Sequence, residues 1–256
     1  MLGGEAGCQR LSADFYSRVG KDPILRPLFP GKSLRCAIEE FAAFLIQFLD
    51  GDETQTQYRW WLSLRESHAR FQIGPAQRSA WLKHMSAALE AAPLEQWAKA
   101  ALQDFFLHSS AYVVGKETTG PEHGELAARW AGQRLLDEAI TAISAGRDEE
   151  AVALLPNFAL RPSVYAGLLA RMMQSERPDQ LRFVIDAIAG DPSLSTRRFS
   201  GRTLLHFASG AGSLEVAVLL LRLGTDPDVQ DAGGHTPLYR VANECAAETG
   251  QNWFAR

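Results

Sequence analysis

The sequence predicts an all-α protein that consists of two helical parts of different composition. Residues 1–115 carry aromatic side chains at the spacing of helix faces, whereas the chain from residue 132 onward is rich in Ala, Leu and Val. In that second part, apolar runs recur at a fixed interval. The length of 256 residues also exceeds that of a usual single domain. We therefore expect two domains, over residues 1–115 and 132–256, and a linker over residues 116–131.

Four helices are predicted in the first part, over residues 9–19, 34–49, 75–91 and 94–114. The second has an unusually aromatic face that includes Phe41, Phe44 and Phe48, and Asp50-Gly51 is a typical C-terminal stop. Proline at the first position suits the third helix. After the fourth, the run GKETTGPEHG collects Gly, Pro, Thr and charged residues, which is typical of an exposed connector.

Composition and charge argue against several classes of protein. A hydrophobic share of 46% is too high for a disordered chain. The formal net charge of -4 gives no attraction to nucleic acid or to an anionic membrane surface. No apolar run approaches the roughly 20 residues that a membrane span needs, and the N-terminus lacks a secretion signal. The three cysteines, Cys8, Cys36 and Cys245, are too far apart for a disulfide framework, so we expect a cytoplasmic protein.

The second part repeats itself with a period of 33 residues. Similar apolar runs begin at Glu150, Phe183 and Val216, and Thr203 recurs as Thr236 at the same interval. Each repeat exposes an apolar face that only the neighbouring repeat can cover. The period therefore predicts an elongated stack of helix pairs.

The repeats resemble the ankyrin family. TLLHFA from Thr203, LEVAVLLLRLG from Leu214 and the turn TDPDVQD are similar to that family's consensus, and TPLYRVA from Thr236 opens the next repeat. Two earlier units, over residues 133–157 and 163–195, keep only the helix spacing. The resemblance implies a structural role for His206 and a protein partner bound near residues 226–235. Because the last repeat is incomplete at Arg256, we expect either a longer natural chain or a cap formed by Trp253 and Phe254.

One histidine in the first part has a distinctive environment. His68 lies in a short helical turn between two aromatic helices. A histidine beside an apolar segment is more often structural than an iron ligand, whereas His84 and His108 have no metal-ligand spacing at all. Around His68, however, other residues together describe a flat apolar slot: Tyr16, Phe29, Ala37, Phe41 and Trp81.

Residues 3 to about 113 resemble a truncated haemoglobin, and most closely its second group. The resemblance rests on six stretches in order: Gly3-Gly4, DFYSRV from Asp14, DPILRPLFP from Asp22, FLIQFLDG from Phe44, LRESHARFQI from Leu64 and AWLKHM from Ala80. It implies a truncated, two-over-two globin-like helical domain followed by an ankyrin-repeat helical stack. It also implies haem b, with its iron, as the cofactor.

The resemblance assigns roles to particular residues of the slot. His68 is expected to be the proximal iron ligand, and Tyr16 and Trp81 are expected to donate hydrogen bonds to a ligand on the distal side. Ala37 stands where classical globins place a distal histidine. The remaining cofactor-binding residues are expected to be Phe29, Phe41, Phe71 and Arg65, the last as a partner of a haem propionate, with Arg70 and Tyr58 as further candidates.

The leading hypothesis is a haem protein that binds dioxygen or another diatomic gas reversibly. The repeats then mediate a protein interaction, for gas sensing or scaffolding. One alternative is a haem-dependent nitric oxide dioxygenase or a peroxidase-like enzyme, which needs a separate electron donor. Another is an interaction module that has lost its haem. The sequence does not indicate a hydrolase or a kinase, because it lacks the acid–base pairs, the nucleophile elbow and the phosphate-binding loop of those enzymes.

Overall fold

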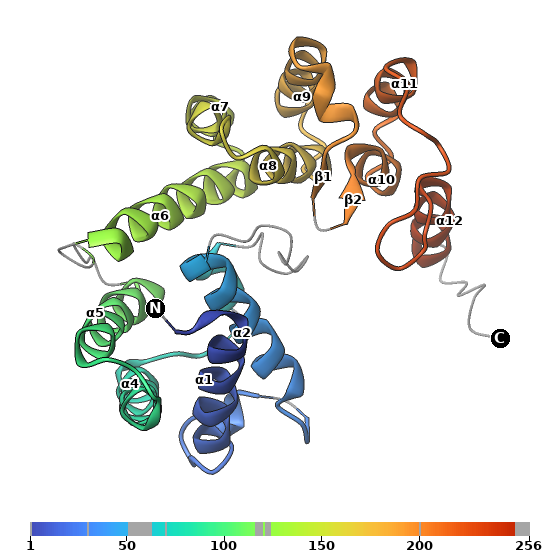
Figure 1. Cartoon of the computed structure of the whole chain (residues 1–256). Coiled ribbons are helices and arrows are strands. Elements are labelled where there is room, and N and C mark those ends of the chain that lie inside the picture. The colour runs from blue at the N-terminus through green and yellow to red at the C-terminus, as the bar shows by residue number, and fades with distance from the viewer. Residues whose placement is uncertain are drawn as a thin grey trace. The chain divides into compact units, whose positions relative to one another are not determined.

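The computed structural model is an all-α protein, as the sequence predicts (Figure 1). It describes residues 2–29, 31–50, 63–69, 71–115, 120, 124–199 and 201–248, and only the backbone of residues 50 and 243–248. The chain forms two compact units, Met1–Glu138 and Ala139–Arg256. No helix among these residues is long and apolar enough to cross a membrane.

The first unit is built from two helix pairs and short connecting elements. Its elements are α1 (Gly4–Val19), the 3-10 helix η1 (Arg26–Leu28), α2 (Arg35–Asp50), α3 (Leu64–Ala69), α4 (Pro75–Ala91), α5 (Gln96–Val113) and the first part of α6 (Gly124–Ala145). α1 packs on α2 and on α4, and α4 packs on α5. This is the two-over-two arrangement expected from the sequence, and its core is rich in phenylalanine. Each fully buried phenylalanine contributes about 1.5–3 kcal/mol through the apolar surface that it removes from water.

The predicted first helix begins too late, because α1 starts at Gly4 rather than at residue 9. Gly7 and Cys8 are buried in its first turns. A side chain at position 7 would collide with the backbone of Leu2. Because these residues are small, the chain before the helix can pack closely against it. The helix prediction relied on the spacing of large apolar residues, so it missed this first part of α1.

α6 begins inside the predicted linker and contributes to the core of the first unit. Leu126 and Trp130 belong to that core, and the Trp130 ring lies 5.8 Å from the Phe105 ring and 5.3 Å from the Tyr112 ring. Gly120 has a φ of +87°, and a Cβ there would collide with the Trp130 indole. Residues 116–119 and 121–123 lie outside the described residues, so for them the linker stays a prediction.

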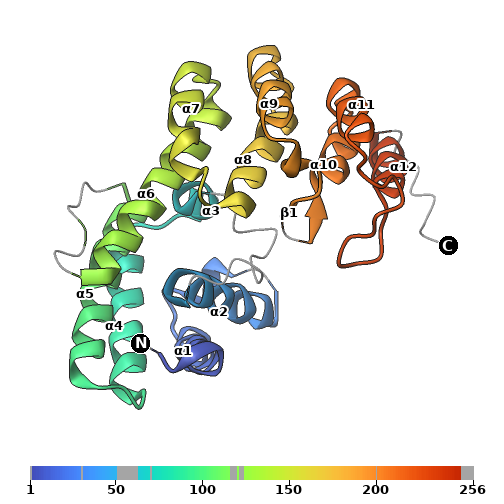
Figure 2. The same ribbon diagram turned by 45° about the horizontal axis from the view of Figure 1, so that its top comes forward.

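The second unit is a stack of helix pairs (Figure 2). One row consists of α8 (Pro162–Gln174), α10 (Leu204–Gly210) and α12 (Pro237–Glu248), and the other of α7 (Asp148–Leu154), α9 (Pro178–Gly190) and α11 (Leu214–Arg222). Successive helices within each row contact one another. The connecting segments contain η4 (Leu155–Phe158), η5 (Pro192–Ser195) and the antiparallel strands β1 (Arg198–Phe199) and β2 (Arg202–Thr203).

The threonines that marked the repeat period take equivalent positions. Thr203 directly precedes α10 and Thr236 directly precedes α12. The backbone N–H of Thr203 donates to Nδ1 of His206 over 3.2 Å, and Nε2 of His206 lies 3.0 Å from the carbonyl oxygen of His235. Because Nδ1 accepts and a carbonyl cannot donate, His206 is neutral with its proton on Nε2, and burial lowers its pKa. His206 thus joins two adjacent repeats, in agreement with the structural role expected for it.

Replacing His206 by alanine should lower the free energy of unfolding of the second unit by about 2–3 kcal/mol, because the buried N–H of Thr203 and the half-buried carbonyl of His235 lose their hydrogen-bond partner. Urea titration followed by circular dichroism measures this change. His108→Ala, which alters a half-buried histidine on α5, is the control and should change the stability far less. Equal stability of the two variants would contradict the role of His206.

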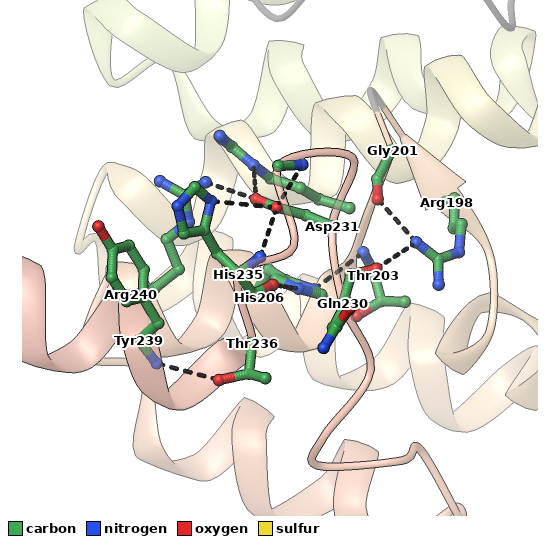
Figure 3. Close-up of polar contacts among 12 residues, drawn as sticks. Arg198, Gly201, Thr203, His206, Gln230, Asp231, His235, Thr236, Tyr239 and Arg240 are labelled. Atoms are coloured by element: carbon green, nitrogen blue, oxygen red, sulfur yellow. Dashed lines mark hydrogen bonds and ion pairs between the residues drawn. The ribbon is translucent and has the colours of Figure 1, made fainter.

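A buried carboxylate stabilises the loop before α12 (Figure 3). Asp231 is 4% exposed at its side chain, and its Oδ2 accepts from Arg202 over 3.2 Å and also from Arg240. Its Oδ1 accepts from the backbone N–H groups of Gly233 and His235, over 2.9 and 3.0 Å. The cluster therefore connects β2, the loop and α12. Residues 249–256, including the cap expected from Trp253 and Phe254, lie outside the described residues.

Candidate functional site

A chain of aromatic ring contacts joins α3 to α1 and α2 in the first unit. The His68 ring lies 6.4 Å from the ring of Phe71, which lies 6.0 Å from that of Phe29. Phe29 follows η1, and its ring meets Tyr16 of α1 at 5.7 Å. Tyr16 in turn lies 6.2 Å from Phe41 of α2. The structure therefore brings together five side chains that the sequence placed in one slot.

Trp81 of α4 is connected to this group by the ring of Phe106, which was not among the expected site residues. Its ring lies 5.5 Å from that of Phe106, and Phe106 lies 6.2 Å from Phe41. Trp81 also packs at 5.2 Å on Phe15, the neighbour of Tyr16. Phe106 could be recognised from the sequence as part of an apolar helix face, but its position behind the slot depends on how α5 packs.

The side chains of this group are neither buried nor fully exposed. Tyr16, Phe29, Phe41 and Trp81 are half-buried and pack against the core, and His68 and Phe71 are half-buried as well. Directly behind them, Phe15 and Phe106 are almost completely buried. A contiguous set of partly exposed aromatic side chains is typical of a surface that binds an apolar ligand. Its chemistry fits one face of a flat, apolar, aromatic ring system such as haem.

His68 is held in the tautomer that a proximal ligand needs. Its Nδ1 lies 2.7 Å from the carbonyl oxygen of Leu64, one turn earlier in α3, and 3.1 Å from the hydroxyl of Ser67. A carbonyl oxygen can only accept, so Nδ1 carries the proton. In a neutral imidazole the lone pair then belongs to Nε2, the nitrogen that can ligate a metal. The donor chemistry of His68 therefore fits haem iron.

The hydroxyl of Tyr16 is protonated at neutral pH. Burial, and then the negative charge of Glu40, raise the pKa of Tyr16 above its ordinary value of 10. The hydroxyl can therefore donate a hydrogen bond. Ala37 lies one turn before Phe41 on α2 and is half-buried, so its methyl group adds little bulk on that side of the group.

Hydrogen bonds of two side chains fix the segment between α1 and Phe29. Arg26 donates from its guanidinium to the carbonyl oxygen of Phe29 over 2.7 Å. Asp22 accepts from the backbone N–H groups of Ile24 and Leu25, each over 2.8 Å, and its other oxygen lies 2.7 Å from Nε2 of His84 on α4. The hydrogen bond with His84 is the main reason that the pKa of Asp22 is low. His84 thus has a tertiary partner that sequence spacing could not reveal.

Arg65, the residue expected to pair with a propionate, interacts with Tyr112 of α5. Its guanidinium carbon lies 4.0 Å above the centre of the Tyr112 ring, and its Nε donates to the Tyr112 carbonyl oxygen over 3.3 Å. The role of Arg65 toward a propionate stays a prediction. The two other candidates for that role, Arg70 and Tyr58, lie outside the described residues. No group of three or more His, Cys, Asp or Glu side chains that could hold a metal ion occurs within the described ranges.

Two family models match separate parts of the chain. The model of bacterial-like globins matches residues 1–109, and that of ankyrin repeats matches residues 188–239. The globin match covers α1 to α5 up to the last turn of α5, together with every expected site residue. The ankyrin match covers the end of α9 through the start of α12, where the repeat consensus is clearest.

Relatives of known identity match the same two parts. Group 2 truncated hemoglobin YjbI of Bacillus subtilis is 34% identical over 92 residues, which are 36% of this chain and 69% of that protein. Group 2 truncated hemoglobin 3-1 of Lotus japonicus is 28% identical over 107 residues, or 41% of this chain and 64% of that protein. E3 ubiquitin-protein ligase HACE1 of Xenopus tropicalis is 40% identical over 70 residues, or 26% of this chain but only 8% of that much longer protein.

A solved structure of hemoglobin from Chloroflexus aurantiacus is 38% identical and covers 46% of this chain and 94% of that chain, with a TM-score of 0.42. The family assignment depends on the sequence relatives, in particular on the Bacillus protein, of which the chain covers more than two thirds at more than 30% identity. The chain therefore belongs to the bacterial-like globins. Residues 1–109 are those of a truncated haemoglobin of group 2 type, and ankyrin repeats follow them in the sequence.

Proposed function

We propose that this protein binds haem b through His68 and uses it to bind dioxygen or another diatomic gas reversibly. The observation that supports this most directly is the position of His68. Its Nδ1 is committed to the Leu64 carbonyl, and its ring ends a row of half-buried aromatic side chains. When bound, haem would supply an iron atom to which a diatomic gas could bind.

Different residues of the chain have different roles in such a site. Nε2 of His68 offers the lone pair that ligates the iron, and Phe29, Phe41 and Phe71 offer apolar surface that excludes water. On the distal side, the hydroxyl of Tyr16 and the indole N–H of Trp81 are the two donors expected to face a gas. Both keep their protons at neutral pH, so both can favour a ligand that accumulates negative charge.

Removing these donors should weaken dioxygen binding selectively. In Tyr16→Phe or Trp81→Phe the loss of one hydrogen bond costs about 1–2 kcal/mol, so the affinity for dioxygen should fall roughly 5–30-fold. Carbon monoxide gains little negative charge, and its affinity should change much less. Stopped-flow measurement of association and dissociation rates for both gases gives these affinities.

Tyr165→Phe is the matched control, because this tyrosine lies on α8 in the second unit. It should leave both gases unaffected. If Tyr16→Phe and Trp81→Phe leave dioxygen binding unchanged, or weaken carbon monoxide binding equally, neither residue donates to the gas and the proposed distal side is wrong.

We also propose that the second unit binds a protein, for gas sensing or for scaffolding. The loop from residue 226 to residue 230 supports this assignment, because most of its side chains are exposed while Asp231 fixes its end. A rigid loop that presents exposed side chains loses little conformational entropy when a partner binds. Cys8 and Cys36 have free thiols, which agrees with the cytoplasmic location that we propose.

A further inference from the structure

The short helix α3 is capped by a residue from the far end of the first unit. Asp137 lies on α6, 1% exposed, and its Oδ1 accepts from the backbone N–H of Leu64 over 2.9 Å. Ser63 completes the cap, because its hydroxyl oxygen accepts from the N–H of Glu66 over 2.9 Å. The first turn of the helix that carries His68 is therefore held by α6.

One residue, Leu64, connects Asp137 with His68. Its backbone N–H donates to Oδ1 of Asp137 over 2.9 Å, and its carbonyl oxygen accepts from Nδ1 of His68 over 2.7 Å. In the protein interior the dielectric constant is low, so a buried charge acts strongly on neighbouring hydrogen bonds. The negative charge of Asp137 thus lies two hydrogen bonds from the imidazole and makes the ring more electron-rich.

The environment of this carboxylate keeps its charge weakly screened. Burial raises the pKa of Asp137 to about 6, against the hydrogen bonds that favour its charged form. Gln133, one turn earlier on α6, donates to Oδ1 over 3.1 Å. Burial, and then the Asp137 charge, raise the pKa of Tyr112 to about 12. The guanidinium carbons of Arg65 and Arg134 lie 4.0 and 5.8 Å from the centre of the same Tyr112 ring.

We infer that Asp137 is a positioning residue for His68: by holding Leu64 it orients the imidazole, and its buried charge makes the imidazole a stronger electron donor to the iron. This rests on the haem binding proposed above. Carboxylates that are hydrogen-bonded to the ligating histidine are known to raise its basicity, and here the carboxylate acts from one residue further away. Asp137 lies beyond the part of the chain that matches the globin model.

Asp137 gives α6 a function within the first unit. A movement of this helix would change the cap of α3 and, with it, the orientation of His68.

The test compares Asp137→Asn with the wild-type full chain, both loaded with haem. Asparagine keeps an oxygen that can accept from the N–H of Leu64 but removes the charge. The variant should remain folded, because asparagine has nearly the same shape and its amide oxygen can take the place of Oδ1 as an acceptor. In resonance Raman spectra of the ferrous, gas-free protein, the iron–histidine stretching band should move to lower wavenumber in Asp137→Asn, and the ferric/ferrous midpoint potential should become more positive.

Glu138→Gln is the matched control, since it neutralises the next residue of α6, which is exposed. It should keep the wild-type band and potential. If haem binds but Asp137→Asn has the same band and potential as the wild type, this inference is overturned and the proposed function stands. If the wild-type chain takes up no haem, both are overturned.

A second measurement needs no variant. In the wild-type full chain, the amide hydrogen of Leu64 should exchange with solvent slowly, although it lies in the first turn of a six-residue helix. Hydrogen exchange followed by NMR resolves this position. Fast exchange would show that Asp137 does not hold Leu64, and would overturn the inference independently of the haem.

Discussion

Replacing Asp231 by alanine should lower the free energy of unfolding of the second unit by about 3–5 kcal/mol, because it removes one partner of a buried ion pair. The variant removes the carboxylate that both Arg202 and Arg240 bind, and each arginine is only 20% exposed at its side chain. It also leaves the N–H groups of Gly233 and His235 without their acceptor. Urea titration followed by circular dichroism measures the loss.

Asp228→Ala is the control for this variant, because Asp228 is exposed in the same loop. It should change the stability by less than about 0.5 kcal/mol. Equal stability of Asp231→Ala and Asp228→Ala would mean that the cluster around Asp231 contributes nothing to the repeat stack.

The same carboxylate makes the second unit sensitive to acid. Burial by itself raises the pKa of Asp231, but the hydrogen bonds from Arg240, His235, Gly233 and Arg202 outweigh it and hold this pKa well below its ordinary value. The folded state therefore binds the proton more weakly than the unfolded state. The stabilisation is complete above the ordinary pKa of about 4 and is lost as the pH falls below it. This acid-dependent loss should be absent from Asp231→Ala.

The second large effect is expected for Trp130→Ala, which should destabilise the first unit by about 3–5 kcal/mol. The Trp130 side chain is 2% exposed and packs on Phe105 and Tyr112, so its removal leaves a cavity in the globin core. Unfolding of the first unit, followed by tryptophan fluorescence or by haem absorbance, measures this. The result tests whether α6 is an integral part of the globin unit.

Trp97 provides a matched control, since it is 64% exposed on α5. Trp97→Ala removes the same side chain from the surface and should change the stability by far less. If the two variants were equally stable, α6 would not be packed in the globin core, and the cap that Asp137 provides for α3 would lose its support.

Local sequence patterns were sufficient to predict most of the architecture. The aromatic stripe with Phe41, Phe44 and Phe48 forms one face of α2, and the interval between Thr203 and Thr236 gives the register of α10 and α12. Such features depend on the periodicity of one segment or on the repetition of a whole unit. The start of α6 could not be predicted in this way, because Gly and Pro before it indicate a connector, while the burial of Trp130 depends on α5.

The aromatic part of the candidate site also follows from the sequence, whereas its polar contacts do not. Tyr16, Phe29, Phe41, Phe71 and His68, which the resemblance names as site residues, form one row of ring contacts, and their roles toward haem stay a prediction. The pairing of Arg65 with Tyr112 and the cap provided by Asp137 join residues that are 47 and 73 positions apart. A polar side chain can have many partners at such separations, and only the packing of α3, α5 and α6 selects one.

The central claim is that His68 binds haem iron, and an absorption titration of the apoprotein with haemin tests it most directly. For the wild-type chain we expect stoichiometric binding, with a Soret band that shifts on reduction and again on addition of carbon monoxide. In His68→Gly the proximal ligand is missing, so the spectrum should differ, and added imidazole should restore the wild-type bands. Haem spectra that are identical in His68→Gly and wild type, or a wild-type chain that shows no Soret band after haemin addition, would contradict the claim.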